Sequence, residues 1–386
     1  MKTKFDFDTP VNRRNTDSLK WDDCPDCEVL PLWVADMDFR TSPAIIDAIE
    51  KRAAHGIFGY THPGKVYYQA VRDWFNRRHN WDIPSENIIY TTGVVPATSS
   101  VIKGLTKPGD GVVIMTPVYN CFYSSIRNNE CQTIGSPLII ENGLYKIDFS
   151  DLENKLALPE AKILLLCNPH NPGGRVWTKE ELAHVNELCV KHNIIVLSDE
   201  IHNEIVMPGY KYTPFAHVAT GEYVSMVSAS KSFNTAGLHI ANIVTPFEQL
   251  REKIKRAVNV NETCDVGPFG VVATIAAYNE SEDWLNAMID YVHENYKYLC
   301  NELKEFPQIK VLPLEGSYLA WVDVRALGKP VAEISERLRS QAKVWFTAGT
   351  TYGPEGEGYI RINMATAHVT FAEAINRFKK WLKDNI

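Results

Sequence analysis

The stretch Tyr223 to Gly237, YVSMVSASKSFNTAG, decides the fold and contains the most reactive candidate residue of the chain. Its first five residues are an apolar, β-prone run, and the serine cluster that follows surrounds Lys231. Ligands of open α/β sheets bind beyond the carboxyl ends of the strands, so this lysine has a position that suits a site. Partial shielding from water would lower its pKa and allow its amine to form a Schiff base with a carbonyl group. Taken alone, the stretch fits an ordinary surface lysine equally well.

Two upstream runs are expected to be strands of the same sheet, and both end in polar residues. Lys162 to Cys167 (KILLLC) leads into a loop that holds Asn171, and Ile194 to Ser198 (IIVLS) leads into Asp199. An amide, a carboxylate and a lysine at three strand ends are the polar partners of a pyridoxal phosphate (PLP) ring. The carboxylate keeps the pyridine nitrogen protonated, Lys231 forms the imine, and the amide donates near the phenolic oxygen. This order of strand ends therefore predicts a PLP site.

The segments NPHNPGG, SDEIH and SASKSFN resemble the fold-type I PLP-dependent enzymes of the class I/II aminotransferase family. Pro31 to Phe39 (PLWVADMDF), with Gly93-Val94-Val95-Pro96, narrows the resemblance to the MalY/PatB-type cystathionine β-lyase (C–S lyase) branch. The resemblance extends from Phe5 to the C-terminal helix. It implies an α/β fold in which a large domain has a mainly parallel seven-stranded sheet flanked by helices. A smaller α+β domain is then formed from both chain ends.

The length of 386 residues also predicts two domains, because single cores stop growing below this size. We expect residues 1–45 to form an arm that joins the small domain, residues 46–285 the large PLP-binding domain, and residues 286–386 the small domain. A flexible tail is the alternative for Met1 to Lys20. Asp36 and Asp38 lie among apolar residues, and carboxylates are rarely buried without partners.

The resemblance assigns roles to individual residues. It makes Lys231 the catalytic residue, Tyr119 the residue that stacks on the ring, and Arg361 the bidentate partner of the substrate α-carboxylate. Tyr60 would reach the PLP phosphate of the neighbouring subunit in a homodimer with shared active sites. The expected cofactor-binding residues are Lys231, Asp199, Asn171, His202, Tyr119, Gly93, Val94, Val95, Ser228, Ser230 and Tyr60. The expected substrate-binding residues are Arg361, Asn171, Ala35 and Tyr119.

Two histidines depart from the broader aminotransferase pattern. His202 stands where those enzymes usually have tyrosine, and His239 stands where many have a phosphate-binding arginine. Histidine is mostly neutral at pH 7, so a direct cationic contact from His239 is not expected. A plain packing role for His239 is equally open.

These residues predict a PLP-dependent C–S lyase that converts cystathionine or other cysteine S-conjugates to a thiol, pyruvate and ammonia by α,β-elimination. A class I/II aminotransferase is the alternative, because both reactions begin with removal of the Cα proton. A catalytically dead regulator is a third possibility. The complete set of Lys231, Asp199, Asn171 and Arg361 argues against it.

The net charge, the cysteine spacing and the lengths of the apolar runs argue against several other classes of protein. The net charge of −7 gives no reason to expect nucleic acid as a partner. Cys24 and Cys27 form a single C-x-x-C without a second pair, so no metal site is expected. The N-terminal sequence MKTKFDFDTP has no apolar signal region, and no apolar run is long enough to span a membrane. We therefore expect a cytoplasmic protein without a membrane partner.

Overall fold

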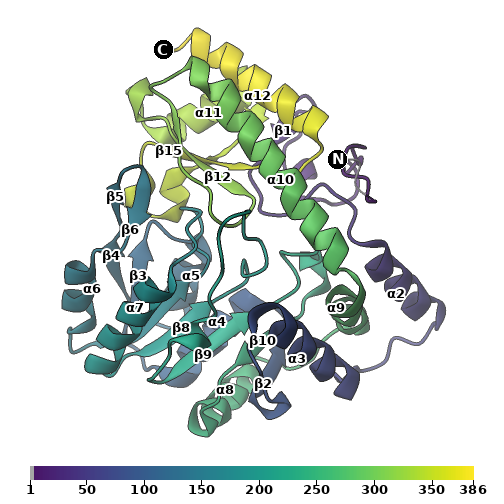
Figure 1. Ribbon diagram of the computed structural model, residues 1–386, viewed down its shortest axis with the longest axis vertical. Helices are drawn as coiled ribbons and strands as arrows, with labels where there is room; N and C mark the ends of the chain where they lie inside the picture. Colours follow the sequence, from purple (N-terminus) through teal and green to yellow (C-terminus); the bar gives the residue numbers. More distant parts are fainter. Residues whose placement is uncertain (1–3) are drawn as a thin grey trace.

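Seven strands form the central sheet of the computed structural model, which describes residues 4–386 (Figure 1). The spatial order is β2-β10-β9-β8-β7-β3-β4. The strands are β2 (Ile88–Thr91), β3 (Gly111–Thr116), β4 (Gln132–Pro137), β7 (Ala161–Cys167), β8 (Ile195–Asp199), β9 (Tyr223–Val227) and β10 (Ala241–Val244). All neighbours from β9 to β4 pair in parallel, whereas β10 is antiparallel to both β2 and β9. The predicted mainly parallel seven-stranded sheet is confirmed.

Helices cover both faces of this sheet, because its strands are apolar on both sides. Successive residues of β3 point to opposite faces: Val112 packs with one helical layer and Val113 with the other. The first layer contains α4 (Val94–Leu105), α5 (Asn120–Asn128) and α8 (Glu248–Val260). The second contains α6 (Phe149–Leu156) and α7 (Lys179–Lys191). A capping box of Thr178 and Glu181 begins α7, which joins the parallel strands β7 and β8.

A second, antiparallel sheet lies beyond the first and has the order β11-β12-β15-β14 (Figure 1). Its strands are β11 (Lys310–Val311), β12 (Leu319–Asp323), β14 (Thr347–Ala348) and β15 (Tyr359–Asn363). The helices packed with it are α10 (Glu282–Glu302), α11 (Val331–Gln341) and α12 (His368–Lys383). Its core also includes side chains of α2 (Pro43–Ala54), α3 (Lys65–His79) and α9 (Pro268–Glu280). Shorter elements include α1 (Leu19–Asp22) and the hairpin of β5 (Ile139–Glu141) and β6 (Leu144–Lys146).

The N-terminal segment lies beside the C-terminal part of the chain. Strand β1 (Leu30–Pro31) pairs in parallel with β13 (Val344–Trp345), so the N-terminal segment joins the C-terminal part of the molecule (Figure 1). The domain limits at residues 45 and 285 stay predictions, and the second of them falls within α10. None of the helices among residues 4–386 has the length and apolar character needed to cross a membrane.

A flexible tail was the alternative for Met1 to Lys20. Met1 to Thr3 fall outside the described residues, and the residues from 4 to 20 are anchored to the rest of the protein. Phe7 is buried against Phe39 and Trp284, with ring centroids 5.0 and 5.6 Å away. Lys20 is 0% exposed, and its Nζ lies 2.8 Å from a carboxylate oxygen of Asp38. An aromatic anchor and a buried ion pair therefore fix this arm, and neither had been inferred from its polar sequence.

Candidate active site

A cavity of about 300 Å³ lies at the carboxyl ends of β7, β8 and β9. Most residues predicted for the site line it: Ala35, Gly93, Val94, Val95, Tyr119, Asn171, Asp199, His202, Ser230 and Lys231. His239, for which a packing role had been left open, lines it as well. The sheet topology explains this, because parallel strands bring residues that follow them to one edge. Arg361 reaches the same place from β15 of the second sheet.

Lys231 follows β9 and is half-buried. Its Nζ donates a hydrogen bond to the carbonyl oxygen of Ala35 at 2.5 Å, and the Tyr318 hydroxyl donates to the same oxygen at 3.0 Å. Burial, and after it the nearby charge of Arg361, lowers the pKa of Lys231 to about 8. The amine is therefore far closer to neutral at physiological pH than an ordinary lysine, as a Schiff-base residue requires.

Asp199 ends β8 and is buried. The backbone N–H of Ile201 donates to its Oδ1 at 3.1 Å. Burial raises the pKa of Asp199 to about 7, since Lys231 supplies only a weak opposing charge. The buried Asp199 carboxylate therefore has too little positive charge near it to stabilise its ionised form. A protonated pyridine nitrogen would supply that charge.

Arg361 connects the loop after β7 with the N-terminal segment. One terminal nitrogen donates to Oδ1 of Asn171 at 3.2 Å, and the other donates to the Trp33 carbonyl at 2.8 Å. Its guanidinium carbon also lies 4.7 Å from the Tyr352 ring centroid. The Nε of this buried side chain has no hydrogen-bond partner among residues 4–386. A donor is therefore still available for an anionic group such as a carboxylate.

His202 follows Asp199 on the same loop and is buried beside the cavity. Burial, with the charges of Lys231 and Arg361, lowers its pKa to about 3, so the ring is neutral at pH 7. Its Nδ1 has no hydrogen-bond partner within the described chain. A neutral imidazole can either donate or accept at this atom, which suits a contact with a cofactor oxygen.

Backbone groups dominate the opposite end of the cavity. Gly93, Val94 and Val95 form the start of α4, where the first N–H groups lack intrahelical partners and can bind a phosphate. Ser230 lines this end as well. Ser228 does not: its hydroxyl donates to the Ile240 carbonyl at 2.7 Å and accepts the Ser230 N–H at 3.1 Å. Its observed contacts hold the loop, and a phosphate contact from it stays a prediction.

Tyr119 and Tyr60 have contrasting positions. Tyr119 is half-buried at the cap of α5 and lines the cavity, where burial raises its pKa well above that of a free phenol. Tyr60 lies on the loop between α2 and α3, fully exposed at 102%, and does not line the cavity of its own chain. Its predicted role therefore requires a second subunit.

The sequence did not single out every residue of the site. Thr92, Cys167, Ile201, Ala236 and Ile240 line the cavity, and Tyr318 holds the Ala35 carbonyl. Thr92, Cys167 and Ile201 lie close in the sequence to predicted site residues, and Ala236 and Ile240 follow Lys231 before β10. Closeness in the sequence could therefore have indicated them. Tyr318 precedes β12, far from any predicted site residue in the sequence, so no such signal pointed to it.

The donor set fits PLP. A buried carboxylate, a lysine of lowered pKa, an unpaired imidazole nitrogen and the free N–H groups of α4 surround one cavity. These are the partners of the pyridine nitrogen, the aldehyde, the phenolic oxygen and the phosphate, respectively. No group of three or more His, Cys, Asp or Glu side chains among residues 4–386 is placed to hold a metal ion.

Known proteins agree with this geometry. The aminotransferase class I and II family matches residues 28–378. Cystathionine beta-lyase PatB of Bacillus subtilis (strain 168) is 39% identical, over 97% of this chain and 99% of that protein. Protein MalY of Escherichia coli (strain K12) is 35% identical, over 93% of this chain and 94% of that protein.

The crystal structure of cystalysin from Treponema denticola, which contains a pyridoxal 5′-phosphate cofactor, superposes with a TM-score of 0.95. It is 37% identical and covers 98% of this chain and 99% of that one. PLP is therefore the cofactor of this protein. The chain belongs to the aminotransferase class I and II family and, within it, to the PLP-dependent C–S lyases of the MalY/PatB type.

Proposed function

We propose that the protein cleaves cystathionine and other cysteine S-conjugates by α,β-elimination. The reaction breaks the Cβ–S bond and consumes one water, and it yields a thiol, pyruvate and ammonium. The observation that carries this proposal is that Lys231 and Asp199 line one cavity together with Ala35 of the Pro31 to Phe39 segment. Arg361 is hydrogen-bonded to Asn171, which lines the same cavity. The relative PatB bears the name cystathionine beta-lyase, which supports the same substrate class.

Each residue has a defined task. PLP, when bound, withdraws the electron pair that remains on Cα after its proton is removed. Arg361 binds the α-carboxylate and orients the Cα–H bond toward Lys231, which takes the proton at Nζ. The protonated Nζ can then deliver this proton to the departing sulfur, so that a thiol leaves. Asp199 keeps its charge next to the cationic pyridine nitrogen, and His202 stays neutral because its pKa is about 3.

We also propose that the active enzyme is a homodimer in which Tyr60 serves the partner's cofactor phosphate. The support is the exposure of an apolar loop: Ile57 is 66% exposed and Phe58 58%, next to the fully exposed Tyr60. Contiguous exposed apolar residues mark protein interaction sites. Among residues 4–386, Lys231 is the only lysine or arginine that lines the cavity, and it is assigned to the imine, so a hydroxyl donor from Tyr60 would contribute to phosphate binding.

The elimination is tested by incubating the holoenzyme with cystathionine or S-methylcysteine in the absence of any keto acid. We expect stoichiometric pyruvate and thiol from the wild type and from a Lys253→Ala control, which changes an exposed lysine on α8. Lys231→Ala should lose turnover by several orders of magnitude while it retains noncovalently bound PLP. Product formation only after a keto acid is added, without thiol release, would instead identify an aminotransferase.

A further inference from the structure

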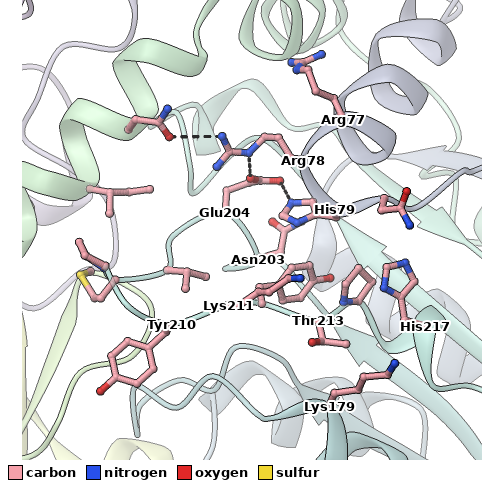
Figure 2. A pocket seen from close by; sticks show the side chains of 18 of the residues that line it. Arg77, Arg78, His79, Lys179, Asn203, Glu204, Tyr210, Lys211, Thr213 and His217 are labelled. Carbon is pink, nitrogen blue, oxygen red and sulfur yellow. Dashed lines mark hydrogen bonds and ion pairs between the residues drawn. The ribbon is translucent and has the colours of Figure 1, made fainter.

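A second pocket, of about 660 Å³, lies apart from the PLP cavity (Figure 2). The end of α3, the loop after β8, the first residue of α7 and one side of α10 form its walls. None of its lining residues belongs to the set that lines the PLP cavity. The mechanism above uses none of them.

The carboxylate at the centre of this pocket is already neutralised. Glu204 is buried and accepts hydrogen bonds at 2.7 Å from Arg78 Nε and His79 Nε2 (Figure 2). It accepts a third, at the same distance, from Trp74 Nε1. These three donors hold the pKa of Glu204 below its usual range although burial opposes them. Arg77 and Arg78 are further occupied by Glu282. This ion-pair group is therefore complete without a ligand.

Two lysines of this pocket, unlike Arg77 and Arg78, are not paired with carboxylates of the described chain. Lys179 and Lys211 line the pocket, and neither has an ion-pair partner among residues 4–386. His217 lies near both: burial, and after it the charges of His79, Lys179 and Lys211, lowers its pKa. In Figure 2, Lys179 and His217 are close to each other on one side of the pocket. Asp290 of α10 is the only lining carboxylate of the described chain besides Glu204.

Two further features point to a ligand with an organic body. Asn203 is 2% exposed, lines the pocket, and its Nδ2 has no hydrogen-bond partner within the described chain. The wall also contains Val206 and Tyr210, which offer apolar surface, with the buried Met207 between them in the chain. Pockets of this size with an apolar wall and a few convergent polar groups are typical of small-molecule sites.

We propose that this pocket binds a small organic oxyanion, with Lys179, Lys211 and His217 around the anionic group and the Val206–Met207–Tyr210 wall against its apolar body. Lysine binds phosphate and carboxylate groups as a point charge. The site is separate from the PLP cavity and does not depend on the lyase reaction.

The test is calorimetric titration of the holoenzyme, in which PLP already fills the cofactor phosphate site. Phenyl phosphate and benzoate are the probes, and benzyl alcohol is the uncharged control. We expect saturable binding of at least one anion, and the better of the two identifies the oxyanion as phosphate or carboxylate. Lys179→Met/Lys211→Met should weaken this binding about tenfold per lysine, the effect of losing one hydrogen bond to a charged group.

Controls separate this site from the active site and from general charge effects. Lys253→Met/Lys255→Met removes the same charge from α8 and should leave the affinity unchanged. Arg361→Lys should also leave it unchanged. Binding that Arg361→Lys weakens and the pocket variant does not would place the anion in the active site and overturn the proposal. Equal binding of benzyl alcohol, or no saturable binding of either anion, would overturn it as well.

Discussion

The charge state of Lys231 carries the prediction for cofactor loading. Its pKa of about 8 means that the amine becomes largely neutral above that pH, and only the neutral amine attacks an aldehyde. We predict that covalent attachment of PLP to the apoenzyme accelerates as the pH rises and levels off above about pH 8. Stopped-flow absorbance of added PLP measures this rate.

The matched variant is Arg361→Gln, which removes the charge that helps to lower the Lys231 pKa. Its rate profile should move to higher pH. A wild-type midpoint near the ordinary lysine value of 10.5 would contradict the assignment.

Arg361 carries the prediction for substrate binding. Arg361→Lys keeps the charge but loses the planar fork, so it should raise KM for every amino-acid substrate. The expected loss is about 1–3 kcal/mol, the worth of hydrogen bonds to a charged group. Steady-state kinetics with cystathionine and S-methylcysteine measure it. Unchanged KM together with a loss of PLP affinity would make Arg361 a cofactor ligand instead.

For individual residues, the sequence indicated which side chains meet at the cavity, but it did not indicate their contacts with backbone carbonyls. Lys231, Asp199 and Asn171 follow recognisable strands, so their meeting at one cavity could be foreseen. The carbonyls of Ala35 and Trp33 could not, because every residue has a carbonyl and their partners are 196 and 328 residues away.

The N-terminal arm is the element whose stability depends most on charge pairing. Burial alone would raise the pKa of Asp38, but Lys20 at 2.8 Å, with Trp21 and Arg13, holds it below the usual value. Its stabilising contribution is therefore complete at neutral pH and disappears as the pH falls below about 3.8. The arm carries Ala35, so its position also determines that of the Lys231 partner.

We predict that Asp38→Asn lowers the free energy of unfolding by about 3–5 kcal/mol at pH 7, because it leaves the buried Lys20 ammonium with only the more distant carboxylate of Asp36, 3.8 Å away. Urea unfolding followed by tryptophan fluorescence measures the loss. The double variant Lys20→Met/Asp38→Leu removes both charges and should cost much less. If the two variants are equally destabilised, the burial of charge is not the cause.

Element prediction succeeded where local signals were strong. The apolar runs that form β7, β8 and β9 appear where strands were expected. Two-residue strands such as β1 and β13 escaped prediction, because they are defined by pairing with each other and not by their own sequence. The antiparallel direction of β10 likewise depends on its neighbours.

For the whole molecule, the proposed dimer yields a complementation prediction. Tyr60→Phe and Lys231→Ala homodimers should each be impaired. A hybrid dimer contains one site with Lys231 from one chain and Tyr60 from the other, so pyruvate production should partly return when the two variants are mixed. Differently tagged subunits, purified in tandem, confirm that hybrids are present.

Hybrids that form without recovered activity would show that Tyr60 does not act across the interface. Mixing Lys231→Ala with Asp199→Ala is the matched control. Both residues belong to the same chain's cavity, so this hybrid contains no intact site and should stay inactive.

The contact between Arg361 and Trp33, which spans 328 residues, has a consequence for biosynthesis. A ribosome releases the N-terminal arm first and β15 among the last elements, so a nascent chain holds Lys231 and Asp199 long before it holds Arg361. During that interval the arm also lacks β13, its partner strand. The proposed contact for the substrate carboxylate is therefore added only when translation is nearly finished. A chain stalled before residue 361 holds Lys231 and Asp199 but lacks this contact.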